Sequence, residues 1–191
     1  MATTPAGLWY LRALPTLGGL PTLKKQWPYF LLVFLLPTIG TIWWWGTFAD
    51  ARIVVDQTRG PYHYAYLVQN GDFSKLPEAQ QTALRELKHQ KIETGAPITV
   101  LLTDPRTTPR KEWTAQVGYL VEAGAKVAEP LKLADLPARR VIIAQVRAHP
   151  SLAPGKAYAA LIEHLDGHGM KLALPTVETY QGSELTVEMG I

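Results

Sequence analysis

The stretch RVIIAQVRAHPSLAPGKAYAALIEHL, residues 140–165, contains both kinds of element from which the globular part of the chain is built. Its first seven residues are mostly aliphatic and β-branched, as in a buried strand. Residues 154–165 begin with a proline, which helices tolerate in their first turn, and continue with helix-forming alanine and leucine. Gly167 and Gly169 then end the pattern. The stretch predicts a strand followed by a helix.

The same order of elements occurs earlier in the chain. Residues 60–69 alternate and are rich in aromatics, which predicts a strand, and a helix begins at Pro77. Further strands are predicted at 97–103, 113–121, 176–180 and 184–188. At an offset of 77 residues, Pro77, Ala83, Leu84 and Glu86 match Pro154, Ala160, Leu161 and Glu163.

Two such strand–helix–strand–strand units predict an α+β fold. We expect duplicated β-α-β-β units that form a curved antiparallel sheet, with two helices on one face and the halves related by a pseudo-twofold axis. One transmembrane helix is expected to precede this domain.

The predicted transmembrane helix lies in an uncharged stretch, PYFLLVFLLPTIGTIWWWGTF, residues 28–48. About 20 apolar residues are needed to cross the hydrocarbon core of a bilayer, and tryptophans mark its interfaces. We expect the helix over residues 27–49, kinked at Pro37. A buried core helix and a cleaved signal peptide fit less well, since a signal peptide has a shorter apolar region nearer the terminus.

Charged residues are distributed unevenly along the chain. Arg12, Lys24 and Lys25 are the only charged residues before Asp50, which leaves residues 50–191 with 16 basic and 16 acidic residues. Because nucleic-acid binding needs a basic stripe on the folded part, we expect no nucleic-acid partner. Three basic residues precede the span, and only two, Arg52 and Arg59, follow it closely. Because the flank with more lysine and arginine usually stays in the cytoplasm, this predicts a bacterial inner-membrane protein with a cytoplasmic N-terminus and a periplasmic domain.

The remaining segments complete the predicted organisation. Residues 1–26 form a pre-anchor segment that is rich in leucine and broken by prolines, so we expect it to lie on the membrane surface or against a membrane partner. Residues 50–60 are predicted as a linker and 61–191 as one soluble domain. The expected membrane or partner contacts are Trp9, Leu11, Lys24, Lys25, Trp27, Trp43, Trp44 and Trp45.

Three short motifs carry a resemblance to a known family. They are Gln69-Asn-Gly-Asp-Phe73, Thr103-Asp-Pro105 and Val177-Glu-Thr-Tyr180, and in this order they resemble the gyrase-inhibitor-like (GyrI-like) small-molecule-binding domain. That domain is also the effector domain of multidrug-sensing transcription activators. The resemblance covers about residues 60–190; a helix-turn-helix module is missing, so transcription activation is not expected.

The resemblance implies a sheet that curls around a ligand cleft between its halves. In that family a glutamate at the position of Glu178 often faces bulky, frequently cationic aromatic ligands. Strand alternation places Glu178 and Tyr180 on one face, and Tyr66, Trp113 and Tyr119 are candidate walls. The alternative, that Glu178 is an exposed or salt-bridged strand residue and the tyrosines are ordinary core, stays open.

Catalytic and metal-binding patterns are weak. His164 and His168 are four residues apart, as metal ligands on a helix are, but Gly167 interrupts the turn and no third ligand is evident. The nucleophile-elbow, P-loop and dinucleotide motifs do not occur. We therefore expect no metal, no cofactor and no catalytic residues. A small-molecule hydrolase that uses Glu178 is a minority alternative.

Two functions remain open from the sequence. The first is a non-catalytic accessory subunit of a membrane complex, of respiratory or photosynthetic type, whose partners are integral membrane protein subunits and the lipid bilayer. The second is a membrane-tethered sensor or carrier that binds a hydrophobic or cationic small molecule in the cleft near Glu178.

Overall fold

The computed structural model describes residues 23–44 and 49–191. They belong to two compact units that divide after Ile42, one containing most of a helix and the other an α+β domain. The predicted pre-anchor contacts Trp9 and Leu11 lie outside the described residues, and so does Trp45.

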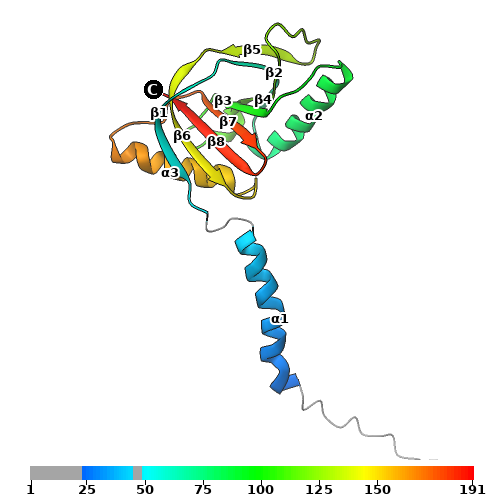
Figure 1. Cartoon of the computed structure of the whole chain (residues 1–191), viewed down its shortest axis with the longest axis vertical. Helices are drawn as coiled ribbons and strands as arrows, with labels where there is room; N and C mark the ends of the chain where they lie inside the picture. Colours follow the sequence, from blue (N-terminus) through cyan, green and yellow to red (C-terminus); the bar gives the residue numbers. More distant parts are fainter. Residues whose placement is uncertain (1–22, 45–48) are drawn as a thin grey trace, which may run out of the picture. The chain divides into compact units, whose positions relative to one another are not determined.

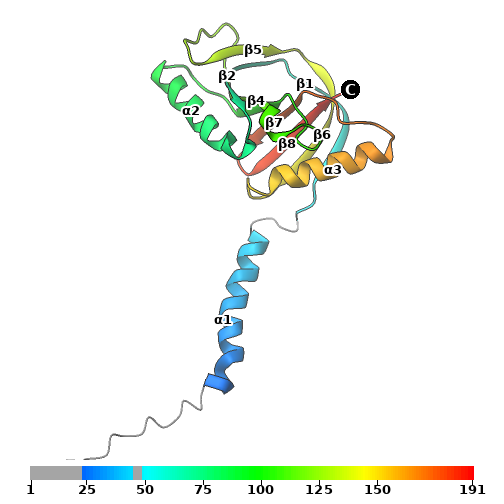
Figure 2. The same cartoon turned by 180° about the vertical axis from the view of Figure 1, so that it is seen from behind.

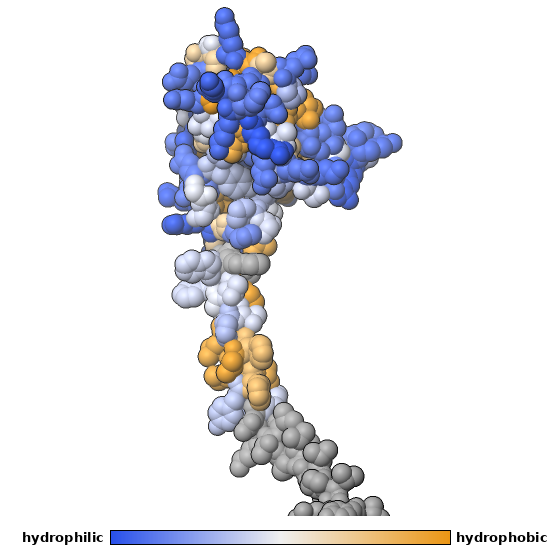
Figure 3. Space-filling view, turned by 90° about the vertical axis from the view of Figure 1, so that its right-hand side faces the viewer, coloured by the Kyte–Doolittle hydropathy of each residue, from blue (hydrophilic) through white to orange (hydrophobic). Residues whose placement is uncertain are grey.

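The N-terminal helix α1 extends over Leu23–Trp44, so it includes Lys24 and Lys25 and ends before the predicted residue 49. By length and composition, the segment Trp27–Trp44 could cross a membrane, and a signal sequence can have the same properties. None of its residues is buried in the described structure. Figure 3 shows orange, apolar side chains on α1, in contrast to the mostly blue face of the domain.

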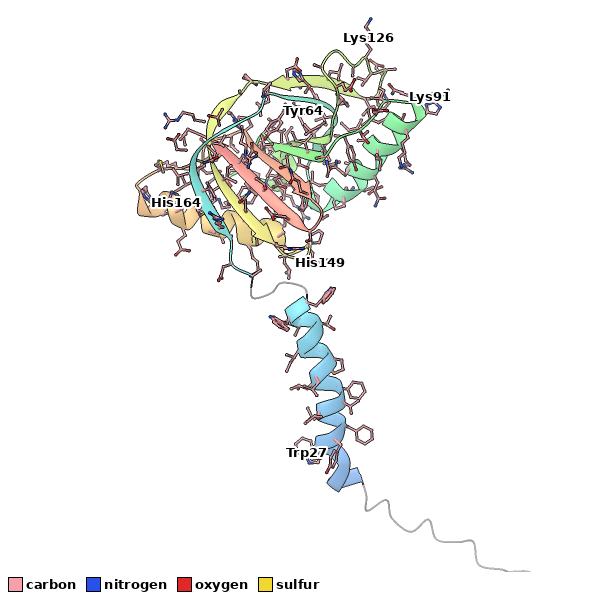
Figure 4. The ribbon with its side chains drawn as sticks, in the orientation of Figure 1. Trp27, Tyr64, Lys91, Lys126, His149 and His164 are labelled. Carbon is pink, nitrogen blue, oxygen red and sulfur yellow. The ribbon has the colours of Figure 1, made fainter. Side chains whose placement is uncertain are left out.

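Two threonine hydroxyls of α1 form hydrogen bonds within the helix. The hydroxyl of Thr38 donates to the carbonyl oxygen of Phe34 at 2.6 Å, and that of Thr41 donates to Pro37 at 2.7 Å. Trp27 lies near the first end of the helix (Figure 4), Trp43 and Trp44 lie at the other, and all three are exposed. The structure thus has one apolar N-terminal helix with aromatic ends.

The domain is built from eight strands, two α-helices and two short 3-10 turns (Figure 1). In chain order the elements are β1 (Arg52–Arg59), β2 (Tyr62–Asn70), η1 (Phe73–Lys75), α2 (Leu76–His89), β3 (Pro97–Leu101), η2 (Arg110–Glu112), β4 (Thr114–Leu120), β5 (Lys132–Leu136), β6 (Arg139–Arg147), α3 (Ala153–Gly167), β7 (Thr176–Gln181) and β8 (Glu184–Gly190).

All eight strands form one antiparallel sheet in the order β1-β6-β8-β7-β3-β4-β2-β5. The predicted units appear as β2-α2-β3-β4 and β6-α3-β7-β8, and they meet where β3 pairs with β7. Each unit contributes three adjacent strands, so the α+β class and the antiparallel sheet are confirmed.

Two strands were missing from the prediction. Residues 52–59, predicted as linker, form β1, which pairs with β6. Residues 132–136 form β5, which pairs with β2. Both are edge strands with mostly exposed side chains, so neither has the alternation of a strand with one buried face.

The sheet curls until its two edges approach each other. Only Gly60 and Pro61 connect β1, at one edge, to β2, next to the other edge, and two residues reach no more than about 7–10 Å. Only Pro137 and Ala138 connect β5 to β6. Figure 1 shows β1 and the start of β6 converging near the C-terminus, which we call the closed end of the sheet.

Glycine at position 118 permits this curl. In β4, a Cβ atom at Gly118 would lie 1.8 Å from the carbonyl oxygen of Ala65 on β2, so no other residue fits without a shift of the backbone. The curl brings the Tyr62 hydroxyl to 2.8 Å from Glu188 on β8, although three strands lie between β2 and β8 in the sheet.

Both domain helices cover the same face of the sheet. α3 packs on Ile142 and Ala144 of β6 and on Val187 of β8. α2 packs through Ala83 and Leu87 on β2. Figure 2 shows from behind that α2 and α3 lie at opposite ends of the sheet. The face between them, on β3 and β7, is where a cleft can form.

Candidate functional site

A hollow of about 350 Å³ opens on the helix-covered face, between the beginning of α2 and α3. Its floor contains Leu101 from β3 and Glu178 from β7. The other lining residues come from the η1–α2 corner, the β3–β4 loop, α3 and the α3–β7 segment, and they are mostly apolar: Phe73, Leu76, Asp104, Pro105, Arg106, Pro154, Gly155, Tyr158, Ile162 and Leu172. We call this hollow the cleft.

Glu178 is the buried acid of the cleft, with 6 % of its surface exposed. It is brought there because register places it beside Thr99 and Val187, whose side chains share the helix-covered face. Burial raises the pKa of its carboxyl group from 4.5 to about 7, and a hydrogen bond from Tyr158 opposes the rise. An apolar cavity with one poorly solvated carboxyl at its floor is a receptor for a cation or a hydrogen-bond donor.

Tyr158 on α3 holds Glu178 in place, and the sequence analysis did not identify it. Its hydroxyl bonds Glu178 and lies 2.8 Å from the hydroxyl of Thr176. Burial and the nearby Glu178 raise its own pKa well above 10, so it remains a hydrogen-bond donor at physiological pH. The spacing of Pro154, Tyr158 and Ile162 along one face of a predicted helix was the signal that could have found it.

Two predicted ligand-binding residues, Tyr180 and Trp113, do not line the cleft but lie near it. Tyr180 packs against the α3 cluster on the same sheet face as Glu178, and burial and Glu178 raise its pKa to about 12. The ring of Trp113 lies 4.9 Å from that of Phe73, a cleft residue, and its indole N–H donates to Thr108 at 2.8 Å. Trp113 therefore packs against Phe73, a residue that lines the cleft.

Tyr66 and Tyr119, which were also predicted to bind the ligand, do not line the cleft. Tyr66 lies on the opposite face of the sheet, packed against Tyr64 with ring centroids 5.6 Å apart. Tyr119 is on the helix-covered face but packs under α2 with Ala65 and Leu87. Strand register explains both positions. Tyr66 pairs with Gly118 and therefore lies on the opposite face from Tyr119, and Tyr119 belongs to the half of the sheet that α2 covers.

The β3–β4 loop contributes an ion pair to the lining of the cleft. Arg106 Nη2 lies 2.7 Å from Asp104 Oδ2, and Arg106 Nε donates to Asp104 Oδ1 at 3.0 Å. The guanidinium holds the pKa of Asp104 below its usual range. Both side chains line the cleft, and that of Arg106 is also exposed to solvent.

A second buried carboxylate, Glu188, lies on the opposite face beneath the closed end of the sheet. It accepts the Tyr62 hydrogen bond, and Arg59 Nε lies 3.8 Å from it. Burial raises its pKa, while Tyr62, Arg59 and Arg139 lower it. Among the described residues, the buried polar atoms without a hydrogen-bond partner are Nε of Arg59, Nε of Arg139 and Oε2 of Glu188.

Metal-ligand side chains do not gather in the described part of the chain. The rings of His164 and His168 lie 4.3 Å apart, and the Nδ1 atom of His168 lies 2.7 Å from the carbonyl oxygen of His164. His164 is labelled on α3 in Figure 4. Within residues 23–44 and 49–191, no group of three or more histidine or acidic side chains could hold a metal ion.

Comparisons with known proteins find likeness in structure but not in sequence. No protein-family model matches the chain, and no curated protein matches it. EcmrR, solved by cryo-electron microscopy as an EcmrR–DNA complex in EcmrR-RPo, aligns with a TM-score of 0.59 at 13% identity, over 88% of this chain and 68% of EcmrR.

Two further structures align with the domain. The crystal structure of the EcmrR C-terminal domain gives a TM-score of 0.57 at 14% identity, over 74% of this chain and 96% of that domain. An integron cassette protein from the mobile metagenome of Vibrio cholerae gives 0.48 at 8% identity, over 74% of this chain and 98% of that protein. The domain therefore has the fold of the EcmrR C-terminal domain.

These neighbours correct the predicted partners. The prediction of integral membrane protein subunits as partners is contradicted, because the aligned EcmrR structures indicate no membrane subunit. The prediction relied on residues 1–26, most of which lie outside the described structure. A leucine-rich segment and an apolar helix do not by themselves specify a protein partner.

Proposed function

We propose that this chain is a membrane-anchored, GyrI-like binding protein, a sensor or carrier whose cleft takes a hydrophobic small molecule that bears a positive charge. The observation that carries the proposal is Glu178, a carboxyl group buried at the floor of an apolar hollow of about 350 Å³. This volume lies at the lower end of the range for small-molecule sites, about 300–1,000 Å³.

The electrostatics of Glu178 favour a cationic ligand. Burial raises the pKa of Glu178 and the Tyr158 hydrogen bond lowers it, and no cation of the protein contributes to compensating its charge. A ligand that brings a positive charge to the cleft supplies that compensation, and its apolar body replaces water along Leu76, Leu101 and Ile162. Phe73 adds an aromatic surface that attracts cations.

Binding is proposed rather than catalysis. Glu178 and Tyr158 are the polar groups at the floor of the cleft, and Tyr158 is already engaged with both Glu178 and Thr176. The arrangement positions a charge but offers no separate nucleophile with an adjacent base, which covalent catalysis requires.

The proposed membrane anchor is α1. It has the length of a span, its threonine hydroxyls bond within the helix, and tryptophans lie at both ends, as lipid requires. Lys24 and Lys25 precede the span, which favours a cytoplasmic N-terminus and a periplasmic domain at a bacterial inner membrane.

Binding of tetraphenylphosphonium to the full chain in a non-ionic detergent tests the proposal. A selective electrode measures the free cation, with protein-free micelles as the blank. We expect saturable binding that Glu178→Gln weakens by about tenfold or more, because the compensating charge is lost. Glu188→Gln is the matched control, a buried carboxylate on the opposite face, and it should change binding by less than about twofold.

Circular dichroism of each variant establishes that the fold is intact. The proposal is wrong if the unmodified protein shows no saturable binding, or if both glutamine variants lose affinity equally while folded.

A further inference from the structure

A second hollow continues the cleft along α3. It also has a volume of about 350 Å³ and shares Asp104, Arg106, Ile162 and Leu172 with the cleft. Its charged lining residues besides the shared pair are Asp166 and Lys171. Since four residues line both hollows, the two hollows are adjacent, and these shared residues lie between them.

The helix α3 aligns the two hollows. Pro154 and Tyr158 line the cleft, Ile162 lines both hollows, and Leu165 and Asp166 line the second. These positions are spaced by three or four residues, so they follow one face of the helix. The hollows therefore form one groove along α3, which the side chains of Asp104 and Arg106 divide.

The dividing pair holds a cation of the protein itself inside this groove. Arg106 binds both carboxylate oxygens of Asp104, whose side chain is only 13% exposed. The Arg106 side chain is 45% exposed, and Asp166 also contributes to raising its pKa. Its guanidinium thus lies close to two acids and has an open path to solvent.

We infer that Arg106 is a displaceable stand-in for a ligand cation, and that the groove takes an elongated ligand with two cationic groups joined by an apolar linker. One cation lies over Glu178, and the other takes the place of the Arg106 guanidinium between Asp104 and Asp166. This rests on the proposed function of the cleft and adds the ligand class.

Charge balance supports the second cation. The second hollow is lined by two acids, Asp104 and Asp166, and two bases, Arg106 and Lys171. When the Arg106 side chain turns into solvent, two acids face Lys171 alone, and one negative charge is left over. A single cationic group of the ligand neutralises it. The departing guanidinium is readily hydrated, because the Arg106 side chain is 45% exposed, and the incoming cation pairs with the mostly buried Asp104 in its place.

The test compares two probes on the full chain in detergent: tetraphenylphosphonium, with one charge, and an alkyl-bridged bis(triphenylphosphonium), with two. Arg106→Gln removes the competing cation, so it should strengthen binding of the dication by about tenfold more than it strengthens binding of the monocation. Asp104→Asn should remove the advantage of the dication. Arg110→Gln is the control, since Arg110 pairs with Asp72 in the same region and lines neither hollow.

The outcomes separate this inference from the proposed function. If Arg106→Gln leaves dication binding unchanged, or strengthens both probes equally, the inference is wrong; Glu178-dependent binding of the monocation then still supports the cleft. If neither probe binds the unmodified protein or the variants, both proposals fail.

Discussion

Two glutamates show how environment assigns different roles to the same residue. Glu178 on β7 and Glu188 on β8 lie one position apart across the strand pair, since Val177 is the register partner of Glu188, and they face opposite sides of the sheet. Glu188 has a tyrosine hydroxyl and two arginines around it. Glu178 has one tyrosine and an apolar hollow. Only Glu178 is left with space for a ligand.

The pH dependence of stability reports the burial of Glu178. In the unfolded chain its proton leaves near pH 4.5, whereas in the folded domain it is held to about pH 7. The folded state therefore binds more protons between these values, and stability falls as pH rises through this window. The loss amounts to roughly 3 kcal/mol.

Urea unfolding of the unmodified protein and of Glu178→Gln at pH 5 and pH 8 measures this loss. Because glutamine does not titrate, the variant should not lose this stability. Between pH 5 and pH 8 we expect its free energy of unfolding to rise relative to that of the unmodified protein by up to roughly 3 kcal/mol. Glu188, whose pKa is also raised, is present in both proteins, so its contribution cancels. Parallel stability profiles would show that Glu178 is hydrated in the folded state.

At the scale of elements, the curl of the sheet separates its two faces into different environments. The connectors Gly60–Pro61 and Pro137–Ala138 join strands at opposite edges, and the Cβ position of Gly60 lies 3.3 Å from Ala138. The inner face is filled by Tyr64, Val100 and their neighbours. The helix-covered face keeps a gap because α2 and α3 pack on different halves.

A substitution at Gly118 tests the curl. Gly118→Ala places a methyl group where the backbone of β2 lies, so we expect it to destabilise the domain by roughly 3 kcal/mol or more in urea unfolding. Gly155→Ala is the matched control, because a Cβ atom there meets nothing within 4 Å in the first turn of α3, and alanine should be neutral or stabilising by up to about 1 kcal/mol. Equal stability of the two variants would contradict the close β2–β4 approach.

At the scale of the whole molecule, the charge is divided between the two units. All acidic residues and 16 of the 19 basic residues lie from Asp50 onwards, and the excess of positive charge lies at Arg12, Lys24 and Lys25. A neutral domain without a basic surface of its own suits a cleft that attracts cations through a few buried acids, and the basic residues before the span suit a cytoplasmic N-terminus.

Cysteine labelling tests the proposed topology, because the chain has no cysteine of its own. Lys126 is exposed on the domain (Figure 4), and Lys126→Cys should react with a membrane-impermeant maleimide in cells whose outer membrane has been opened. Ala2→Cys should react only after the inner membrane is broken. The reverse pattern would invert the topology, and a mass well below 21.2 kDa would show that α1 is a cleaved signal sequence.

Most elements could be predicted because their signals are local. Alternation along 60–69 and 176–180, and proline in the first turn at Pro77 and Pro154, depend only on neighbouring residues, and the structure has strands and helices there. Alternation also places Glu178 and Tyr180 on one face. β1 and β5 were missed because their strand character comes from hydrogen bonds to β6 and β2, far away in the sequence.

The sequence by itself therefore determined the apolar helix, the order of the two repeated units and the face of β7 that carries Glu178. Only the tertiary structure decided which residues share the cleft with Glu178. They include Tyr158 from α3 and Asp104 and Arg106 from the β3–β4 loop, and not Tyr66, which the register between β2 and β4 places on the other face. The physical reason is that periodicity is a property of one segment, whereas a cleft is made of side chains that meet only after the sheet has paired and curled.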